Sequence, residues 1–179
     1  VTALDLTVEN SDNLTVRAGT QIRFNVTRQD TGETVDAAVE VANQTATTGS
    51  DGLLNITIDE GGSYRAVASK AETSETTFNS DSVTIDVFEP ASLNVTAAYR
   101  EVTQAYTGDN VTVQADVANS GDRKGTKTIN LTDSNGNILD DTTVTLNGSE
   151  TTTVVLNTTF DSPGTRTLSA NDVLAGNVT

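Results

Sequence analysis

The sequence predicts an all-β protein built as two tandem antiparallel β-sandwiches, and three observations support this prediction. Apolar and polar residues alternate in many short segments, as they do in strands that have one buried and one solvated face. Turn residues recur at intervals of roughly 8 to 12 residues, which is the spacing of strands in a sandwich. Segments of the first half of the chain reappear in the second half.

The clearest alternation lies in residues 110–117, where every odd-numbered residue is apolar and every even-numbered residue is polar. One face of this strand is therefore expected to be buried and the other to be wet. Val is the most common apolar residue of the chain, which favours strands over helices. The same alternation predicts further strands at residues 21–27, 53–58, 82–88 and 126–131.

Turns are predicted where Gly stands beside Asp, Asn or a second Gly between apolar segments. These sites are residues 30–33, 50–52, 60–62, 134–137 and 146–149. We interpret all of them as hairpin connections between neighbouring strands.

The internal repeat predicts the number of domains. Residues 19–26 match residues 108–115, and residues 62–65 match residues 164–167 near the end of each half. Both offsets are close to the ~100 residues of an immunoglobulin domain. We therefore predict two tandem immunoglobulin-like antiparallel β-sandwiches of about seven strands each, 1–89 and 90–179, with the boundary at a proline that would end strand pairing.

The composition removes most kinds of catalytic chemistry, because the chain has no Cys and no His. It therefore has no thiol nucleophile, no imidazole base and none of the usual ligands of zinc, haem or iron–sulfur clusters. Two carboxylates are enough for a glycosidase, but such an enzyme needs a cleft that two slender sandwiches are not expected to form. We predict that the protein is not an enzyme and has no catalytic residue, no metal and no cofactor.

Acidic residues outnumber basic ones by 25 to 10, which gives a net charge of −15, and they are scattered along the chain. Such a surface repels nucleic acid and anionic lipid, so neither is expected as a partner. Its self-repulsion falls in concentrated salt, where the Debye length shrinks from ~10 Å at 0.1 M to ~3 Å at 1 M. The excess of Asp over Glu and the scarcity of Lys resemble proteins of halophilic archaea, and an ordinary acidic secreted protein is the alternative.

No apolar run approaches the ~18 residues that cross a bilayer as a helix, so we expect no direct membrane insertion of this segment. The chain starts at Val1 without the pattern of a signal peptide, which indicates a processed chain or a piece of a longer one.

Residues 90–179 contain several motifs of turn and strand residues that together resemble one known domain family. The motifs are Gly108-Asp109-Asn110-Val111-Thr112-Val113, Val117-Ala118-Asn119-Ser120-Gly121-Asp122, Gly125-Thr126, Gly148-Ser149-Glu150-Thr151 and Phe160-Asp161-Ser162-Pro163-Gly164-Thr165. The family is CARDB, a cell-adhesion-related immunoglobulin-like domain of archaeal and bacterial surface proteins. The resemblance implies an immunoglobulin-like fold and a location on the cell surface, and with the acidic composition it points to a haloarchaeal surface protein. Residues 119–122 are expected to end a strand with residues that accept a positive φ.

The first half resembles the immunoglobulin-like modules of surface proteins more loosely, through residues 62–66. This segment is similar to the Gly-x-Tyr stretch of a tyrosine corner, with Tyr64 as the residue whose hydroxyl bonds to the backbone. Arg166 stands at the corresponding place in the second half, so no such corner is expected there.

Acceptors for asparagine-linked glycosylation are the most frequent motif, since ten of the sixteen Asn residues begin Asn-x-Ser/Thr. The ten candidates are Asn13, Asn25, Asn43, Asn55, Asn94, Asn110, Asn130, Asn147, Asn157 and Asn177. They predict a secreted glycoprotein with N-linked glycans on some of these sites. The alternative is that polar–apolar–polar alternation in Thr-rich strands creates the motif without any role for a glycan.

Residues 133–137 imitate the start of an EF-hand loop, and Asp140 and Asp141 follow. The twelfth position would be Val144 rather than Glu, and the surroundings are strands, so the EF-hand interpretation fails. A plain Asn-Gly hairpin is the preferred prediction, and a surface calcium ion at Asp140 or Asp141 stays an open alternative.

Sandwich domains often bind sugars on exposed aromatic rings, and Tyr99 and Tyr106 are the candidates in this chain. They flank an expected bend, where they either form a small exposed pair or, as we prefer, cover the open end of the second sandwich. The side chains of Phe24, Phe88 and Phe160 are expected in the cores.

The terminal segments, residues 1–8 and 173–179, either pair within their own domains or donate a strand to a neighbouring molecule. From these features we expect a non-enzymatic extracellular structural or adhesive segment of a halophilic archaeal surface glycoprotein. Its expected partners are other surface proteins or copies of itself. The main alternative is a self-assembling subunit of an extracellular filament or surface layer, and the third is a carbohydrate-binding adhesin.

Overall fold

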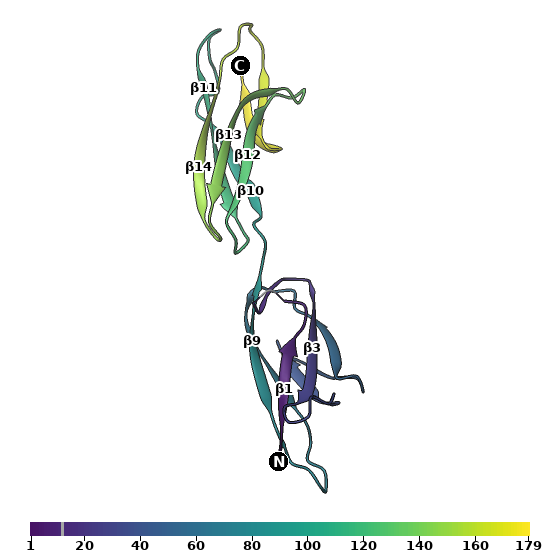
Figure 1. Ribbon diagram of the computed structural model, residues 1–179. Coiled ribbons are helices and arrows are strands. Elements are labelled where there is room, and N and C mark those ends of the chain that lie inside the picture. Colours follow the sequence, from purple (N-terminus) through teal and green to yellow (C-terminus); the bar gives the residue numbers. More distant parts are fainter. Residues whose placement is uncertain (12) are drawn as a thin grey trace. The chain divides into compact units, whose positions relative to one another are not determined.

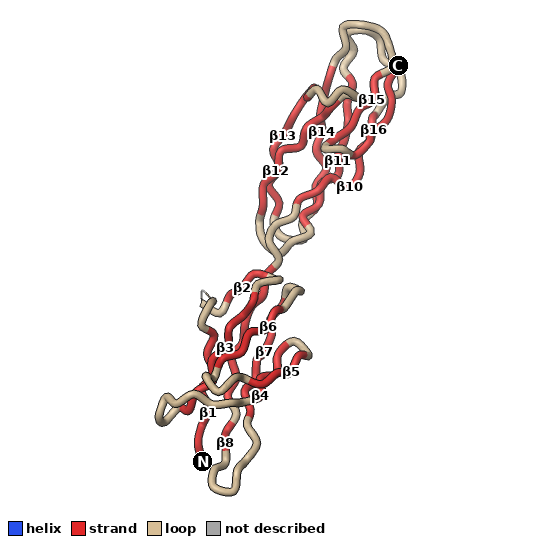
Figure 2. Tube along the Cα trace, turned by 90° about the vertical axis from the view of Figure 1, so that its right-hand side faces the viewer, coloured by secondary structure: helices blue, strands red, loops and turns tan. Residues whose placement is uncertain are grey.

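A computed structural model describes residues 1–11 and 13–179 (Figure 1). Within these ranges every regular element is a β-strand, which confirms the all-β prediction (Figure 2). The described residues also contain no helix long and apolar enough to cross a membrane. The chain divides into two compact units, Val1–Glu89 and Pro90–Thr179.

The first unit contains two sheets in its described residues, with the strand orders β6-β3-β1-β8 and β2-β9-β7-β4-β5. Its strands are β1 (Thr2–Val8), β2 (Thr15–Arg17), β3 (Gln21–Arg28), β4 (Ala38–Val41), β5 (Gln44–Thr47), β6 (Leu53–Thr57), β7 (Gly62–Ser69), β8 (Phe78–Asn79) and β9 (Asp81–Phe88). Two short edge strands run parallel to their neighbours, β8 beside β1 and β2 beside β9, and the other pairs are antiparallel. The unit has more strands than the seven expected. Strands β2 and β8 are three and two residues long, which is too short to show an alternation of apolar and polar residues.

The second unit also contains two sheets, with the orders β10-β11-β14 and β13-β12-β15-β16, and all of its pairs are antiparallel. Its strands are β10 (Leu93–Arg100), β11 (Val111–Asn119), β12 (Gly125–Thr132), β13 (Ile138–Leu146), β14 (Thr151–Thr158), β15 (Arg166–Ala170) and β16 (Val173–Val178). The five strands predicted from alternation are all present, as β3, β6, β9, β11 and β12.

The two units share one topology. The order β6-β3-β1 in the first unit corresponds to β14-β11-β10 in the second, and β9-β7-β4 corresponds to β16-β15-β12. These are the strands E-B-A and G-F-C of an immunoglobulin-like sandwich, with β5 and β13 lying beside strand C. The repeated segments at residues 19–26 and 108–115 contain β3 and the start of β11, which are the central strands of corresponding sheets.

Each unit has its own core between its two sheets, built from the inward face of each strand. In β11 the burial alternates without a break from Val111 to Asn119, as the sequence pattern predicts. Phe24 is fully buried at the centre of the first core. The prediction for the other two rings is only partly right, because Phe160 is half-buried against the second core and Phe88 is half-buried outside both core clusters.

Turn residues mark the connections correctly, but most of these connections are not hairpins. Residues 134–137 join the paired strands β12 and β13, as predicted. Residues 50–52, 60–62 and 146–149 instead carry the chain from one sheet to the other. The hairpin interpretation of these three is wrong, because Gly and Asn supply the same backbone freedom to a corner between sheets as to a hairpin.

Two true hairpins lack Gly and were not predicted. Ala42 and Asn43 join β4 to β5, and Asn171 and Asp172 join β15 to β16. All four residues have positive φ angles, between 41° and 71°, as two-residue type I′ turns require.

Both terminal segments lie within their own units. Strand β1 pairs with β3 and β8, and β16 pairs with β15. Of the two alternatives for these segments, pairing inside their own domain is the one that the structure has.

Asn119 holds together one end of the second unit. It is 2% exposed, and its Oδ1 accepts hydrogen bonds from the backbone N–H groups of Ser92 (2.9 Å) and Gly121 (3.1 Å). Its Nδ2 reaches the carbonyl oxygens of Arg123 (2.8 Å), Leu146 (3.4 Å) and Asn147 (2.9 Å). One side chain thereby joins the start of β10, the end of β11 and the corner after β13.

The expected positive φ angles at residues 119–122 are absent, so that reason for the motif is wrong. Gly121 is required for a different reason, because a Cβ there would lie 1.9 Å from the carbonyl oxygen of Pro90. The motif therefore serves close packing and a buried polar centre rather than an unusual backbone angle.

The substitution Asn119→Ala is expected to destabilise the second unit by about 2 to 4 kcal/mol, since it leaves several buried backbone groups without partners. Urea unfolding monitored by amide hydrogen exchange in residues 90–179 measures this loss. The control is Ser120→Ala, at an exposed neighbouring position, with an expected effect within about 0.5 kcal/mol. Equal stability of the two variants would contradict the assigned role.

Candidate functional site

The ten acceptor asparagines fall into two groups by exposure, and the structure describes all ten. Eight of them are exposed. Asn25 on β3 and Asn130 on β12 are only half-buried, and both lie on strands with neighbours on two sides. Asn25 also donates its Nδ2 to Glu9 Oε1 (3.1 Å), while its Oδ1 is buried.

Half of the eight exposed acceptors lie on edge strands of the sheets. Asn55, Asn94, Asn157 and Asn177 are on β6, β10, β14 and β16, each of which is an edge strand. The other exposed acceptors lie in connections, Asn13 before β2, Asn43 in the β4–β5 hairpin, Asn110 before β11 and Asn147 after β13. Sequence reasoning found all ten but had no means of separating edge positions from central ones.

Two acceptors contact each other across the β11–β14 pair. The Nδ2 of Asn110 donates to Asn157 Oδ1 at 3.0 Å and also reaches Thr112 Oγ1 at 3.2 Å. Thr112 Oγ1 in turn donates to Asn157 Oδ1 at 3.0 Å. The amide nitrogen of Asn110 is therefore engaged twice, whereas Asn157 uses only its oxygen within the described part of the chain.

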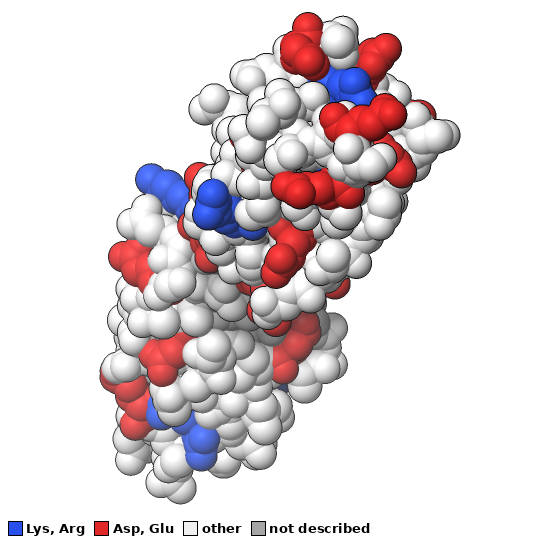
Figure 3. Space-filling view, turned by 90° about the horizontal axis from the view of Figure 1, so that it is seen from below, with Lys and Arg blue, Asp and Glu red and all other residues white. Residues whose placement is uncertain are grey.

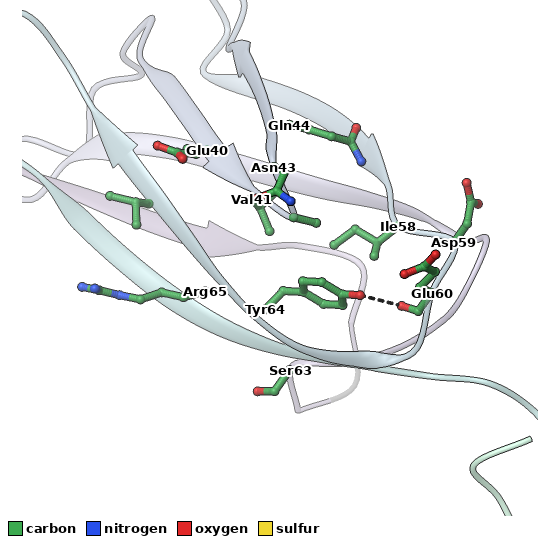
Figure 4. A pocket seen from close by; sticks show the side chains of 12 residues that line it. Glu40, Val41, Asn43, Gln44, Ile58, Asp59, Glu60, Ser63, Tyr64 and Arg65 are labelled. Atoms are coloured by element: carbon green, nitrogen blue, oxygen red, sulfur yellow. Dashed lines mark hydrogen bonds between the residues drawn. The ribbon is translucent and has the colours of Figure 1, made fainter. Parts of the chain in front are cut away.

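Tyr64 forms the predicted tyrosine corner, and Figure 4 shows its ring directed toward Glu60. Its hydroxyl donates to the carbonyl oxygen of Glu60, four residues upstream, at 3.2 Å. The ring packs closely under the backbone, since a Cβ on Gly62 would lie 3.3 Å from it. The corner fixes the entry into β7.

The same region is hollowed into an open groove of about 690 Å³ between the β4–β5 hairpin and the loop before β7 (Figure 4). The carboxylates of Glu40, Asp59 and Glu60 line it. Arg65 lies on the same wall, and its Nη2 donates to Ser82 Oγ at 2.9 Å. The groove is acidic, so it suits neutral hydroxyl-rich groups better than anions.

Arg166 takes the place of the corner tyrosine in the second unit, as the sequence indicates. Its guanidinium carbon lies 5.6 Å from the centre of the Phe160 ring, a cation–π contact. Its Nη2 also donates to Ser162 Oγ at 2.9 Å.

Tyr99 and Tyr106 do not cover the end of the second sandwich, which corrects the preferred prediction for them. Tyr106 is 87% exposed in a turn closed by Asp109. Tyr99 is about half exposed, and its hydroxyl donates to Asp116 Oδ2 at 3.0 Å. This hydrogen bond to a carboxylate raises the pKa of Tyr99 above its ordinary value of 10.0.

The loop after β12 uses its acidic side chain to order the turn. Asp133 Oδ1 accepts hydrogen bonds from the backbone N–H groups of Asn135 (2.8 Å) and Asn137 (3.0 Å), and its Oδ2 accepts from Asn137 Nδ2 (2.9 Å). These bonds, that from the Asn137 side chain above all, lower the pKa of Asp133 below 3.8. Asp140 accepts a hydrogen bond from the backbone N–H of Asn157 at 2.8 Å.

The same carboxylates were the calcium candidates. Their oxygens satisfy backbone groups of the hairpin and of the edge strand β14. No cluster of three acidic residues that could hold a metal ion occurs among residues 1–11 and 13–179.

Acidic side chains are spread over the face shown in Figure 3, with basic side chains in small groups between them. Ion pairs join Arg23 to Glu9 (3.1 Å), Arg28 to Glu33 (3.8 Å) and Lys70 to Asp36. The hydrogen bond and the charge of Lys70 lower the pKa of Asp36 below its ordinary value. Acidic residues outnumber basic ones by 25 to 10, so the chain carries excess negative charge whose repulsion depends on the salt concentration.

Comparisons with known proteins give no family for this chain. No protein-family model matches it, and no curated protein matches it. The resemblance of residues 90–179 to the CARDB family therefore stays a prediction.

Several solved structures are similar to the chain as a whole. The D0-D1 domains of intimin are 16% identical, with 97% of this chain and 96% of that chain covered and a TM-score of 0.35. The fibronectin(III)-like modules of CbhA from Clostridium thermocellum are 12% identical, with 97% and 90% covered and a TM-score of 0.32. The S-layer protein rSbsC(31-844) is 15% identical, with 98% of this chain but 27% of that chain covered and a TM-score of 0.34. The immunoglobulin-like assignment rests on the strand order described above.

The substitution Asn137→Ala is expected to raise the pKa of Asp133 toward 3.8, because it removes the main hydrogen bond to the ionised carboxylate. A carboxyl group whose pKa is lower in the folded state than in the unfolded state stabilises the fold at pH values above its unfolded pKa. This contribution is therefore present above about pH 4 and is lost as the pH falls through the folded-state pKa. NMR titration of the Asp133 carboxyl measures the change. The control is Asn135→Ala, which keeps the backbone donor and should move the pKa less; an equal shift in both variants would count against the assignment.

Proposed function

We propose that this chain is a non-enzymatic, extracellular structural or adhesive segment of a surface glycoprotein that works in concentrated salt. Its role is to act as a spacer between other parts of a cell-surface protein. The acceptor asparagines, the acidic surface and the two sandwich units support this proposal together.

The observation that carries the spacer role is the shortness of the connection between the units. The first unit holds the chain as far as Phe88, whose carbonyl oxygen accepts a hydrogen bond from the backbone N–H of Ala18 at 2.8 Å. The second unit holds it from Pro90, whose carbonyl lies against Gly121. Only Glu89 stands between them in the sequence, so the connection is one residue long.

Assembly by strand exchange is the less favoured function. The two segments that would serve as donors, β1 and β16, are already paired inside their own units. Exchange would first have to break those ladders, and the acidic surface opposes close approach of two copies.

Sedimentation velocity in about 3 M NaCl tests the proposal, because repulsion is screened there and association is favoured if it exists. A spacer is expected to sediment as a monomer at every protein concentration. A sedimentation coefficient that grows with concentration would support a polymerising subunit instead and overturn the spacer role.

Salt is expected to stabilise the fold. The melting temperature should be higher in about 3 M NaCl than in about 0.1 M, because the excess of carboxylates over basic groups causes the strongest repulsion when the Debye length is long. Circular dichroism during heating measures this, and an unchanged melting temperature would contradict the proposed working environment.

A matched variant separates screening from other effects of salt. Asp59→Asn with Glu60→Gln removes two exposed acidic groups of the groove and leaves the Glu60 carbonyl that binds Tyr64 in place. This variant should gain stability at low salt and gain less, or nothing, at high salt. A gain of the same size at both salt concentrations would argue against carboxylate repulsion.

A further inference from the structure

We propose that five of the ten acceptors carry glycans, Asn13, Asn43, Asn55, Asn157 and Asn177, and that these glycans shield the open edges of the sheets. The inference rests on the proposed extracellular function, and it adds which sites are modified and what the sugars do there. Three features of the structure support it. They are the position of the sites in the sheets, the absence of hydrogen bonds donated by their Nδ2 atoms within the described part of the chain, and the exposed apolar side chain beside Asn157.

Position separates the five from the central sites. The four sheets have eight edge strands within the described residues, and such strands expose backbone N–H and C=O groups that pair readily with another chain. Asn55, Asn157 and Asn177 lie on the edge strands β6, β14 and β16. Asn13 comes two residues before the edge strand β2, and Asn43 lies in the hairpin that leads into the edge strand β5.

The amide nitrogen is the reacting atom, so its hydrogen bonds matter. Transfer of a sugar from a lipid-linked sugar phosphate forms a bond between Nδ2 and the anomeric carbon. The bond from that carbon to the phosphate oxygen breaks, the phosphate leaves with the electron pair, and one amide proton passes to a base of the transferase. The product keeps one N–H, so a side chain that uses both hydrogens loses a bond on modification.

The five proposed sites have exposed side chains and donate no hydrogen bond from Nδ2 within the described part of the chain. Asn110 differs, because its Nδ2 engages both Thr112 and Asn157. The Nδ2 of Asn147 donates to the carboxylate of Glu150 at 3.0 Å, a strong charge-assisted bond.

The remaining acceptors are excluded on burial or contacts. Asn25 and Asn130 are half-buried on central strands, where sugar would displace a neighbouring strand or side chain. Asn94 is on an edge, but Lys127 Nζ donates to its Oδ1 at 3.3 Å and its Nδ2 reaches Ser92 Oγ at 3.4 Å. Both the oxygen and the nitrogen of its side-chain amide therefore already form hydrogen bonds.

Two of the five sites also have surroundings that suit sugar. Val155, two residues before Asn157 and on the same face of β14, is 54% exposed, so a glycan there covers an apolar side chain on an open edge. Asn43 lines the acidic groove, whose carboxylates accept hydrogen bonds from sugar hydroxyls (Figure 4). A glycan in either place adds contacts as well as bulk.

Site mapping tests the assignment. The full chain, purified from its natural host, is digested and its glycopeptides are identified by mass spectrometry. Glycan on the five sites, with none on the other five acceptors (Asn25, Asn94, Asn110, Asn130 and Asn147), is the expected result. Glycan on any of these other five would overturn the assignment, and so would a bare mass of 18.7 kDa.

The touching pair of acceptors gives the sharpest comparison. Thr159→Ala removes the motif of Asn157, and Thr112→Ala removes that of Asn110, without changing either Asn. Thr159→Ala should lower the intact mass by one glycan, whereas Thr112→Ala should leave it unchanged. The reverse result would overturn the argument from the amide nitrogen.

A triple variant tests the shielding role. Thr57→Ala, Thr159→Ala and Thr179→Ala together remove the motifs of Asn55, Asn157 and Asn177, the three proposed glycan sites on edge strands. This variant should form concentration-dependent oligomers in about 3 M NaCl, where the wild-type glycoprotein stays monomeric. A variant that stays monomeric would overturn the shielding role and leave the spacer function standing. A wild-type protein that forms oligomers would overturn the spacer function, and the assignment of glycan sites would then be judged by mass spectrometry alone.

Discussion

Each sandwich depends on a central strand whose inward face is fully buried. In β11 the buried apolar residues are Val and Ala, and in β3 they are Ile22, Phe24 and Val26. Protein interiors are close-packed, so the backbones around these faces must approach closely to leave no voids. This constraint explains the glycines that admit no side chain, such as Gly121 beneath the Pro90 carbonyl and Gly52 beneath the Val26 carbonyl, where a Cβ would lie 2.6 Å from the oxygen.

A lean core leaves the ends of each sandwich to be held by polar side chains. Tyr64 closes a corner of the first unit through its hydroxyl, and Asn119 closes an end of the second through both ends of its amide. Thr48, which is 4% exposed, joins two backbone groups of the first unit. Its Oγ1 accepts a hydrogen bond from the Ala37 N–H and donates one to the Val35 carbonyl, both at 2.8 Å. The buried hydrogen bonds of Asn119 and Thr48 are hard to replace, because removing one partner leaves the other unsatisfied.

The strands could be predicted from the sequence because period-two alternation is a direct record of one-sided burial, and the tyrosine corner because its local motif is specific. The destinations of the turns could not, since Gly and Asn allow the same backbone angles in a hairpin as in a corner between sheets. The role of Asn119 was hidden for another reason: its partners include backbone groups 27 and 28 residues away, which no local pattern records. The exposure of Tyr106 likewise depends on tertiary packing.

The candidate acceptors could be found from the sequence, but their ranking could not. Whether an Asn lies on an edge or a central strand depends on pairing between distant segments. Asn110 and Asn157, 47 residues apart, become neighbours only when β11 and β14 pair. The distinction between an engaged and an open amide nitrogen therefore exists only in the folded chain.

Arg100 has a consequence for mechanics. Its Nη1 donates to the Ala175 carbonyl at 3.1 Å, and its guanidinium occupies the space where a side chain on Gly176 would stand. The first and last strands of the second unit, β10 and β16, belong to different sheets and are joined by this side chain. Beyond β16, the backbone of Thr179 also forms hydrogen bonds with Thr103 and Ala105, both at 3.0 Å. Tension applied at the two ends of the unit therefore acts on these contacts, so the seam between the sheets resists stretching together with the hydrophobic interior.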